Sequence, residues 1–189
     1  MQLLKEKILS EGIVLNDRIL KVDSFLNHQI DPDLMLEIGK EFARRFAEQK
    51  IDRILTIEAS GIAVALATGF ILHVPVVFAK KSASEIMNEE AYVAKVHSFT
   101  KKITSNVSVL RKFLPAGEKV LILDDFLAHG EAAVGLASLV EQAGSTVVGI
   151  GIVIEKQFQG GAEKINAKGY NLESLARIKA FENGRVILD

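Results

Sequence analysis

The sequence has 189 residues, of which 49% are hydrophobic and 25% charged, a composition typical of one globular domain with a substantial core. Its 23 Lys and Arg residues nearly balance 24 Asp and Glu residues, so the net charge of −1 argues against binding to nucleic acid or to an anionic membrane. It contains no Cys, which excludes disulfides and thiolate metal sites, and no apolar run approaches the ~20 residues that cross a bilayer. We therefore expect a single domain over residues 1–189 in the cytoplasm.

The N-terminal quarter predicts two helices separated by extended chain. Apolar residues at helical spacing indicate a first helix that stops near Gly12, namely Leu3, Leu4, Ile8 and Leu9. Residues 13–22 are predicted to be extended. Asp31 suits an N-cap and Pro32 the first helical position, and the helix that follows carries one apolar stripe, formed by Leu34, Ile38, Phe42 and Phe46.

From residue 53 the chain alternates between short apolar runs and helical segments. The predicted strands are 53–57, 74–80, 119–123 and 146–155, and the predicted helices are 60–72 and 130–144. This pattern favours a doubly wound α/β fold, with a mainly parallel sheet and helices on both faces. The polar segment Ser82–Lys102 interrupts the pattern, and we expect it to form a flexible hood over a site.

Ligands of open α/β sheets bind beyond the carboxyl ends of the strands. Three segments of this chain directly follow predicted strands and are candidates for ligand binding. The first is Glu58–Ile62, whose small residues lead into a helix and expose backbone N–H groups that could bind an anion. Taken alone, this segment is better explained as a tight turn between strand and helix.

The second segment contains Asp124 and Asp125, which are expected to leave the predicted strand, followed by the small-residue loop Ala128–Ala132. Gly130 lets a phosphate approach the backbone at the start of the next helix. Because two carboxylates would repel that phosphate, they are expected to face vicinal hydroxyls or a divalent cation. In the competing interpretation, Asp125 caps a turn and Asp124 is solvated at the sheet edge. Two adjacent acidic residues followed by this loop favour a binding role instead.

The third segment is Glu155–Lys156 at the end of a long apolar strand, where Lys156 could donate to a ligand oxygen. Known phosphate and metal motifs are missing: there is no G-x-G-x-x-G between a strand and a helix, no P-loop and no H-E-x-x-H. His129 lies in the loop and could border a phosphate, but we assign it no acid–base role.

The stretch "VLILDDFLAHGEAA" resembles the phosphoribosyl-pyrophosphate loop of type I phosphoribosyltransferases. The resemblance extends over nearly the whole chain to bacterial xanthine phosphoribosyltransferases, through "LKVDSFLNHQIDP", "IEASGIA", "VPVVFAKK", "GIGIVIEK" and "LESLARI". It implies transfer of a phosphoribosyl group from phosphoribosyl pyrophosphate to xanthine, with Mg²⁺ bound to the substrate diphosphate, in a homodimer that serves purine salvage.

The resemblance also implies a role for each matching residue. The catalytic pair Asp124 and Asp125 would hold the ribose hydroxyls. The remaining contacts would be made to the 5′-phosphate by Ala128, His129, Gly130, Glu131 and Ala132, to the purine by Leu20, Asn27 and Lys156, and to the pyrophosphate by Ser60, Gly61, Lys80 and Lys81.

The loop departs from the family pattern, because His129, Glu131 and Ala132 stand where threonines and a glycine often occur. Phosphate binding must then depend on backbone N–H groups, and Glu131 must point away from the anion. Three alternatives remain at this stage: a non-catalytic regulator that senses phosphoribosyl pyrophosphate, an enzyme that prefers guanine or hypoxanthine, and a receiver-like phosphoacceptor domain. The last fits the loop and the hood poorly.

Overall fold

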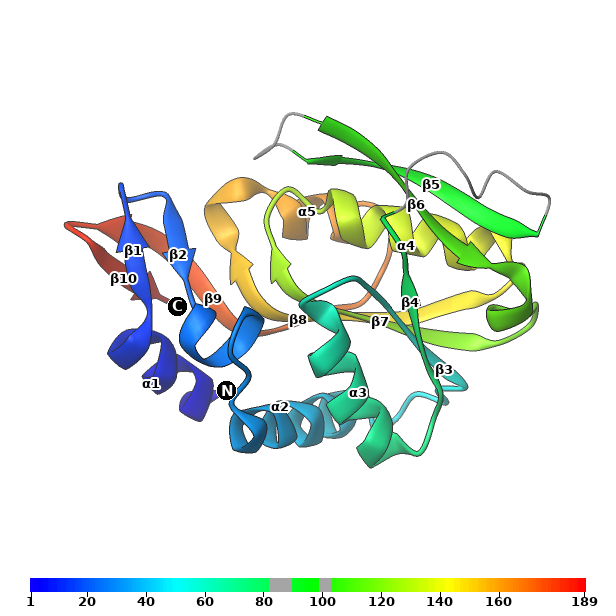
Figure 1. Cartoon of the computed structure of the whole chain (residues 1–189), viewed down its shortest axis with the longest axis horizontal. Coiled ribbons are helices and arrows are strands. Elements are labelled where there is room, and N and C mark those ends of the chain that lie inside the picture. The colour runs from blue at the N-terminus through cyan, green and yellow to red at the C-terminus, as the bar shows by residue number, and fades with distance from the viewer. Residues whose placement is uncertain (82–89, 99–102) are drawn as a thin grey trace.

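The centre of the molecule is a six-stranded sheet in the order β10-β9-β8-β7-β3-β4 (Figure 1). It is seen in a computed structural model, which describes residues 1–81, 90–98 and 103–189. The strands are β3 (Arg53–Ile57), β4 (Val76–Ala79), β7 (Lys119–Leu127), β8 (Thr146–Lys156), β9 (Leu172–Glu182) and β10 (Arg185–Leu188). All neighbours are parallel except β9 and β10, which confirms the predicted, mainly parallel sheet.

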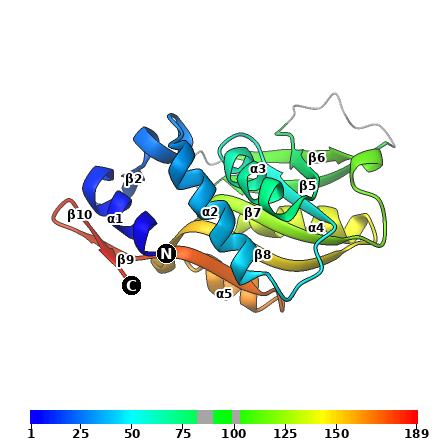
Figure 2. The ribbon, with the colours of Figure 1, turned by 90° about the horizontal axis from the view of Figure 1, so that it is seen from below.

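Helices cover both faces of this sheet, as the alternating pattern predicted. Successive residues of β7 point to opposite faces: Leu121 and Leu123 pack in one hydrophobic cluster, and Val120 and Ile122 in another. The first cluster includes residues of α2 (Pro32–Arg45) and α3 (Gly61–Leu72), and the second includes residues of α4 (Glu131–Gln142) and α5 (Gly161–Asn166). Figure 2 shows α2 running across one face of the sheet.

The N-terminal predictions are confirmed. Helix α1 (Gln2–Glu11) ends with Gly12 as its C-cap, and the extended segment forms a small hairpin of β1 (Ile13–Leu15) and β2 (Ile19–Lys21). A π-helical turn, η1 (Asp23–Asn27), leads to α2. The Asp31 carboxylate accepts hydrogen bonds from the N–H groups of Asp33 and Leu34, which caps α2 as expected. The predicted apolar stripe of this helix is buried throughout.

Strand β7 is longer than predicted, because it continues to Leu127 instead of ending at Leu123. The expectation that Asp124 and Asp125 leave the strand is therefore wrong. The neighbouring β8 supplies the reason: it extends to Lys156 and keeps pairing with β7 as far as Leu127, opposite Glu155. Both acidic residues consequently lie within a strand and not in a loop: Asp124 pairs with Ile152, and Asp125 lies between the paired residues Asp124 and Phe126.

The predicted hood is partly regular structure. Strands β5 (Ala91–Ser98) and β6 (Ile103–Leu110) form an antiparallel hairpin beside α4 (Figure 1), so the described part of the hood is a strand and not an irregular flap. Val96 is buried against α4, where a Cβ on Gly135 would lie 2.6 Å from its Cγ2 atom. Gly135 therefore allows β5 to approach α4 closely. The remaining hood residues, 82–89 and 99–102, lie outside the described residues.

Several elements had no counterpart in the sequence prediction, namely β6, β9, β10, α5, η1 and the short 3-10 helices η2 (Arg111–Phe113) and η3 (Gln157–Gln159). Within the described ranges, the structure contains no helix with the length and apolar character needed to span a bilayer.

Candidate functional site

The acidic pair lies near the carboxyl end of β7 and is almost fully enclosed. Asp124 is 6% exposed and Asp125 8% exposed, and the backbone N–H of Asp125 donates a 3.0 Å hydrogen bond to Oδ1 of Asp124. A buried carboxylate is costly unless it is paired or bound to a ligand. Two such groups next to each other indicate a site whose remaining partners come from a ligand.

The electrostatics of the pair depend on this burial. Removal from water raises the pKa of Asp124 well above its usual range, and the charge of Asp125 and a hydrogen bond between the two side chains raise the pKa further. The backbone hydrogen bond from Asp125 and the charge of Lys81 lower the pKa of Asp124. The charged form of Asp124 would be favoured by hydroxyl donors or a cation at this position.

The turn after β3 meets the acidic pair. A Cβ on Gly61 would lie 2.2 Å from the Thr56 Oγ1 atom and 3.0 Å from Oδ1 of Asp124, so only glycine fits without movement of its neighbours. Ser60, the N-cap of α3, is half-buried beside it. The Thr56 hydroxyl is buried and has no hydrogen-bond partner among the residues that the structure describes.

The end of β4 joins the same turn. The backbone N–H of Lys81 donates to Oε1 of Glu58 over 2.5 Å, and Lys80 forms an isolated bridge with Ser108 of β6. Both lysine side chains are exposed. The structure thus brings the predicted pyrophosphate residues Ser60, Gly61, Lys80 and Lys81 to adjacent strand ends. The peptide bond between Glu58 and Ala59 is cis.

The predicted loop Ala128–Ala132 covers the turn from β7 to α4, whose first two residues are Glu131 and Ala132, and it lies against the start of α5. Gly130 has a φ of +80°, a conformation that favours glycine, and it is the N-cap of α4. A Cβ on Gly161 would lie 2.3 Å from the Ala128 carbonyl oxygen, so α5 begins directly against the loop. No side chain of the described ranges caps α4, which leaves backbone N–H groups at its start available for an anion.

The two unusual side chains of this loop have partners. The Lys164 ammonium of α5 donates to the Glu131 carboxylate and neutralises its charge. A ring nitrogen of His129, Nδ1, lies 3.0 Å from the Gln159 carbonyl oxygen. Lys164 therefore compensates the negative charge of Glu131, which would otherwise disfavour a phosphate at this loop. That Glu131 points away from the anion stays a prediction.

Lys156 ends β8 in an aromatic environment. Its ammonium lies 5.6 Å from the ring centroid of Phe126 and 6.0 Å from that of Phe181, and burial lowers its pKa. Leu20 is buried in the same hydrophobic cluster as both rings, whereas Asn27 is exposed at the end of η1. No hydrogen bond or ion pair of the described residues joins Leu20 or Asn27 to Lys156, so their shared purine contact stays a prediction.

Several residues of this region were missed in the sequence. No local sequence pattern indicates that four further residues contact the predicted site residues, namely Thr56, Phe126, Phe181 and Lys164. The adjacent glycines Gly160 and Gly161 could have indicated this contact, since glycine permits close approach of two backbones. No group of three or more His, Asp or Glu residues that could hold a metal ion occurs within residues 1–81, 90–98 and 103–189.

The arrangement can hold an anion and a polyol side by side. The uncapped start of α4 suits a phosphate, and the acidic pair next to it suits hydroxyl groups or a cation. Lys80 and Lys81 add positive charge at the neighbouring strand ends, and Lys156 can donate to an oxygen.

Known proteins share both the sequence and the fold. Residues 27–183 match the phosphoribosyl transferase domain. A xanthine phosphoribosyltransferase from Ectopseudomonas mendocina is 56% identical over 98% of each chain, and one from Bacillus cytotoxicus is 58% identical over 98% of this chain and 94% of its own.

Solved structures of adenine phosphoribosyltransferases have the same fold at low identity. The enzyme from Thermoanaerobacter pseudethanolicus aligns with a TM-score of 0.75 at 23% identity, covering 92% of this chain and 99% of its own. The enzyme from Trypanosoma brucei, in complex with AMP, pyrophosphate and ribose-5-phosphate, gives a TM-score of 0.78 at 17% identity, covering 92% and 79%.

Proposed function

The chain belongs to the phosphoribosyl transferase family, and from this premise we infer that it transfers the 5-phosphoribosyl group of phosphoribosyl pyrophosphate to xanthine. The products are xanthosine 5′-monophosphate and pyrophosphate. The observation that supports the site most strongly is the buried pair Asp124 and Asp125 beside the uncapped start of α4. One sugar phosphate satisfies both features, with its hydroxyls at the acids and its phosphate at the helix.

The proposed reaction breaks the bond between the anomeric carbon and pyrophosphate and forms a bond from that carbon to a purine nitrogen, whose proton passes to the released pyrophosphate or to water. Positive charge develops on the ribose, and negative charge develops on the leaving group. Asp124 and Asp125 would fix the ribose hydroxyls and offset the positive charge. Lys80, Lys81 and the backbone of the Ser60–Gly61 turn would stabilise the leaving pyrophosphate. The loop from Ala128 to Ala132 would hold the 5′-phosphate and so fix the position of the sugar.

Mg²⁺ is proposed to enter with the diphosphate of the substrate. The buried carboxylates of Asp124 and Asp125 fit this cation, because Mg²⁺ prefers oxygen ligands and because burial and mutual repulsion disfavour the uncompensated charge of Asp124. When bound, the ion would supply positive charge to the diphosphate.

Base choice is proposed to depend on Lys156. An ammonium only donates hydrogen bonds, so it suits a purine oxo group and disfavours the amino group of adenine. Phe126 and Phe181 flank the ammonium, and their rings would limit its motion. Asn27 can donate and accept at once, so it could read a ring N–H or a ring nitrogen, and Leu20 would pack against the base.

A homodimer is proposed through α3. Leu66 is 62% exposed and Phe70 71% exposed, and their i, i+4 spacing puts them on one side of this helix. Burying either side chain would contribute about 1.5–3 kcal/mol, so this face suits a second copy of the chain. Sedimentation should show a dimer that Phe70→Asp dissociates, while Leu9→Asp on exposed α1 leaves it intact. A monomeric wild type would refute this assembly.

The activity is tested with purified protein, phosphoribosyl pyrophosphate, Mg²⁺ and each purine base in turn, by measuring pyrophosphate release. Xanthine is expected to give the highest kcat/KM, and adenine should give little product. Faster reaction with guanine or hypoxanthine would correct the base preference alone. If no base released pyrophosphate while phosphoribosyl pyrophosphate still bound, the chain would be a sensor and not an enzyme.

A further inference from the structure

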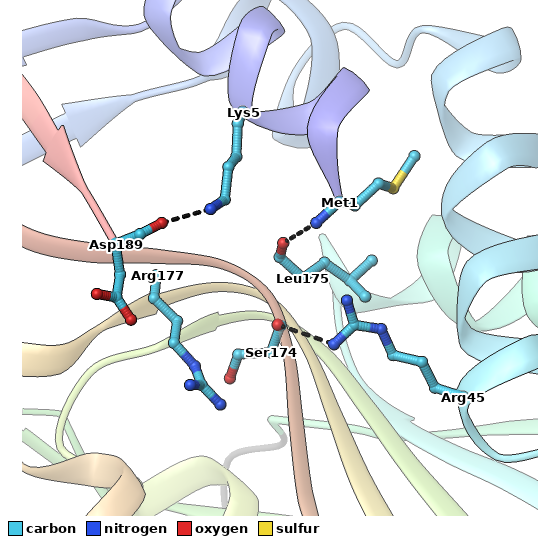
Figure 3. Close-up of a pocket in the computed structure, with 7 residues that line it drawn as sticks. All are labelled: Met1, Lys5, Arg45, Ser174, Leu175, Arg177 and Asp189. Atoms are coloured by element: carbon cyan, nitrogen blue, oxygen red, sulfur yellow. Dashed lines mark hydrogen bonds between the residues drawn. The ribbon is translucent and has the colours of Figure 1, made fainter.

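A polar cavity lies away from the residues proposed to bind substrate. It has a volume of about 230 Å³ and lies between α1, the end of α2 and β9 (Figure 3). Its lining includes Lys5, Arg45, Ser174, Arg177 and Asp189, none of which is a predicted substrate residue. Three cationic side chains from three separate segments therefore meet in one small space.

Arg45 is held in place by its neighbours. Its Nε atom donates to Glu41 over 2.9 Å, and Nη1 donates to Glu173 over 2.8 Å and to the Ser174 carbonyl oxygen over 3.2 Å. Among the described residues, Nη2 has no hydrogen-bond acceptor. The guanidinium is thus fixed in orientation before any ligand arrives, with one nitrogen still able to donate.

Arg177 is held much more loosely. Its Nε atom lies 3.4 Å from Oε2 of Glu155, and that oxygen is buried without a hydrogen-bond partner in the part of the chain that the structure describes. The side chain of Arg177 is 44% exposed, whereas that of Glu155 is 4% exposed. Most donors of this guanidinium are therefore available to another acceptor.

Ser174 supplies an independent observation. The residue is 5% exposed, and its Oγ atom is buried with no hydrogen-bond partner among the described residues. Buried hydroxyls in proteins nearly always have a partner. Figure 3 shows Ser174 between the guanidinium groups of Arg45 and Arg177. An unused hydroxyl donor between two guanidinium groups is suited to a ligand that only accepts hydrogen bonds.

The acidic side chain of the lining is already paired. The Asp189 carboxylate lies 3.2 Å from the Lys179 ammonium, and Lys5 donates to the Asp189 carbonyl oxygen. The charge of Asp189 is therefore compensated by a lysine that does not line the cavity.

We propose that this cavity is a binding site for a small phosphate-type oxyanion, held by Arg45, Arg177 and Ser174. Guanidinium groups match the paired oxygens of phosphate, and the volume suits inorganic phosphate or pyrophosphate better than a nucleotide. Arg177 pairs in register with Glu155, which precedes Lys156 on β8. An anion that draws Arg177 away from Glu155 would therefore act one residue from the proposed purine contact.

The site is tested by amide chemical shifts of the full chain during titration with sodium phosphate and, separately, with sodium pyrophosphate, at constant ionic strength set with chloride. Residues 172–178 are expected to shift and saturate. Ser174→Ala and Arg177→Gln should each weaken this response about tenfold or more. Lys168→Gln, at an exposed position before β9 and outside the cavity, should leave it unchanged.

The local readout separates this site from the proposed substrate site, whose phosphate loop would respond at residues 128–132. Saturation with both salts would identify a general phosphate site, and saturation with pyrophosphate alone a diphosphate site. Shifts confined to residues 128–132 would refute the proposal, as would wild-type affinity in both Ser174→Ala and Arg177→Gln. Ser174→Ala removes only a hydroxyl, so it keeps the test decisive if Arg177→Gln fails to fold. Neither result depends on the chain being an enzyme.

Discussion

Replacing Asp125 by Asn is expected to lower activity without lowering stability. The substitution keeps the size of the side chain and removes its charge, so a carboxylate that holds a ribose hydroxyl becomes a neutral amide. Hydrogen bonds to charged groups contribute about 1.5–3 kcal/mol, which corresponds to a loss of roughly 10- to 160-fold in kcat/KM. The assay is the initial rate of pyrophosphate release with xanthine and Mg²⁺.

Stability should respond in the opposite sense. Because burial and the charge of Asp125 raise the pKa of Asp124, the stability contributed by Asp124 is present below its ordinary pKa of 3.8 and is lost as the pH rises through the raised value. Asp125→Asn removes the charge repulsion, so this loss becomes smaller. The free energy of unfolding in urea at pH 7 should therefore equal or exceed that of the wild type.

Two results would refute this reasoning. An unchanged kcat/KM would remove Asp125 from the ribose site. A fall in the free energy of unfolding at neutral pH would show that the pair stabilises the empty fold, so any lost activity could not be assigned to the ribose contact. Asp52→Asn, at a half-buried position before β3 and at the opposite end of this strand from the site, is the matched control and should leave kcat/KM unchanged.

Three further substitutions test other parts of the site. Gly61→Ala places a Cβ 2.2 Å from the Thr56 Oγ1 atom, so it should raise KM for phosphoribosyl pyrophosphate, and adding Thr56→Ala should recover part of the loss in steady-state assays. Lys164→Gln leaves the Glu131 charge uncompensated beside the phosphate loop. We expect this charge to weaken binding of phosphoribosyl pyrophosphate by about 1 kcal/mol, which raises its KM about fivefold. An unchanged KM for phosphoribosyl pyrophosphate in low salt would contradict this prediction. Burial lowers the pKa of Lys156, so the ammonium loses its proton below the ordinary pKa of 10.5. The affinity for xanthine, corrected for ionisation of the base, should therefore fall as the pH rises toward that value. In Lys156→Arg the side chain stays charged, so its affinity for xanthine should not change over this pH range.

Most of the fold follows from local patterns. Buried apolar runs separated by helical segments predicted the parallel sheet, and Asp31 with Pro32 located the start of α2 correctly. Buried carboxylates are unfavourable in isolation, so the sequence predicts that β7 ends before Asp124 and Asp125, which makes the strand too short. Pairing with β8 carries the strand past them, and this information lies in another segment of the chain.

The hood illustrates a second limit. Residues 91–98 contain small and polar side chains that predict no regular structure alone, yet they form β5, because β6 pairs with them and α4 packs on Val96 next to Gly135. The same limit applies to the polar cavity beside β9. Lys5, Arg45 and Arg177 are ordinary surface cations in the sequence, and only the folded chain brings them together.

The central claim is that Asp124 and Asp125 hold the ribose while the loop from Ala128 to Ala132 holds its 5′-phosphate. A crystal structure with xanthosine 5′-monophosphate tests this most directly. We predict both carboxylates within hydrogen-bond distance of the ribose hydroxyls, with the phosphate on the backbone N–H groups at the start of α4. A phosphate bound elsewhere, or ribose hydroxyls without contact to either carboxylate, would contradict the account.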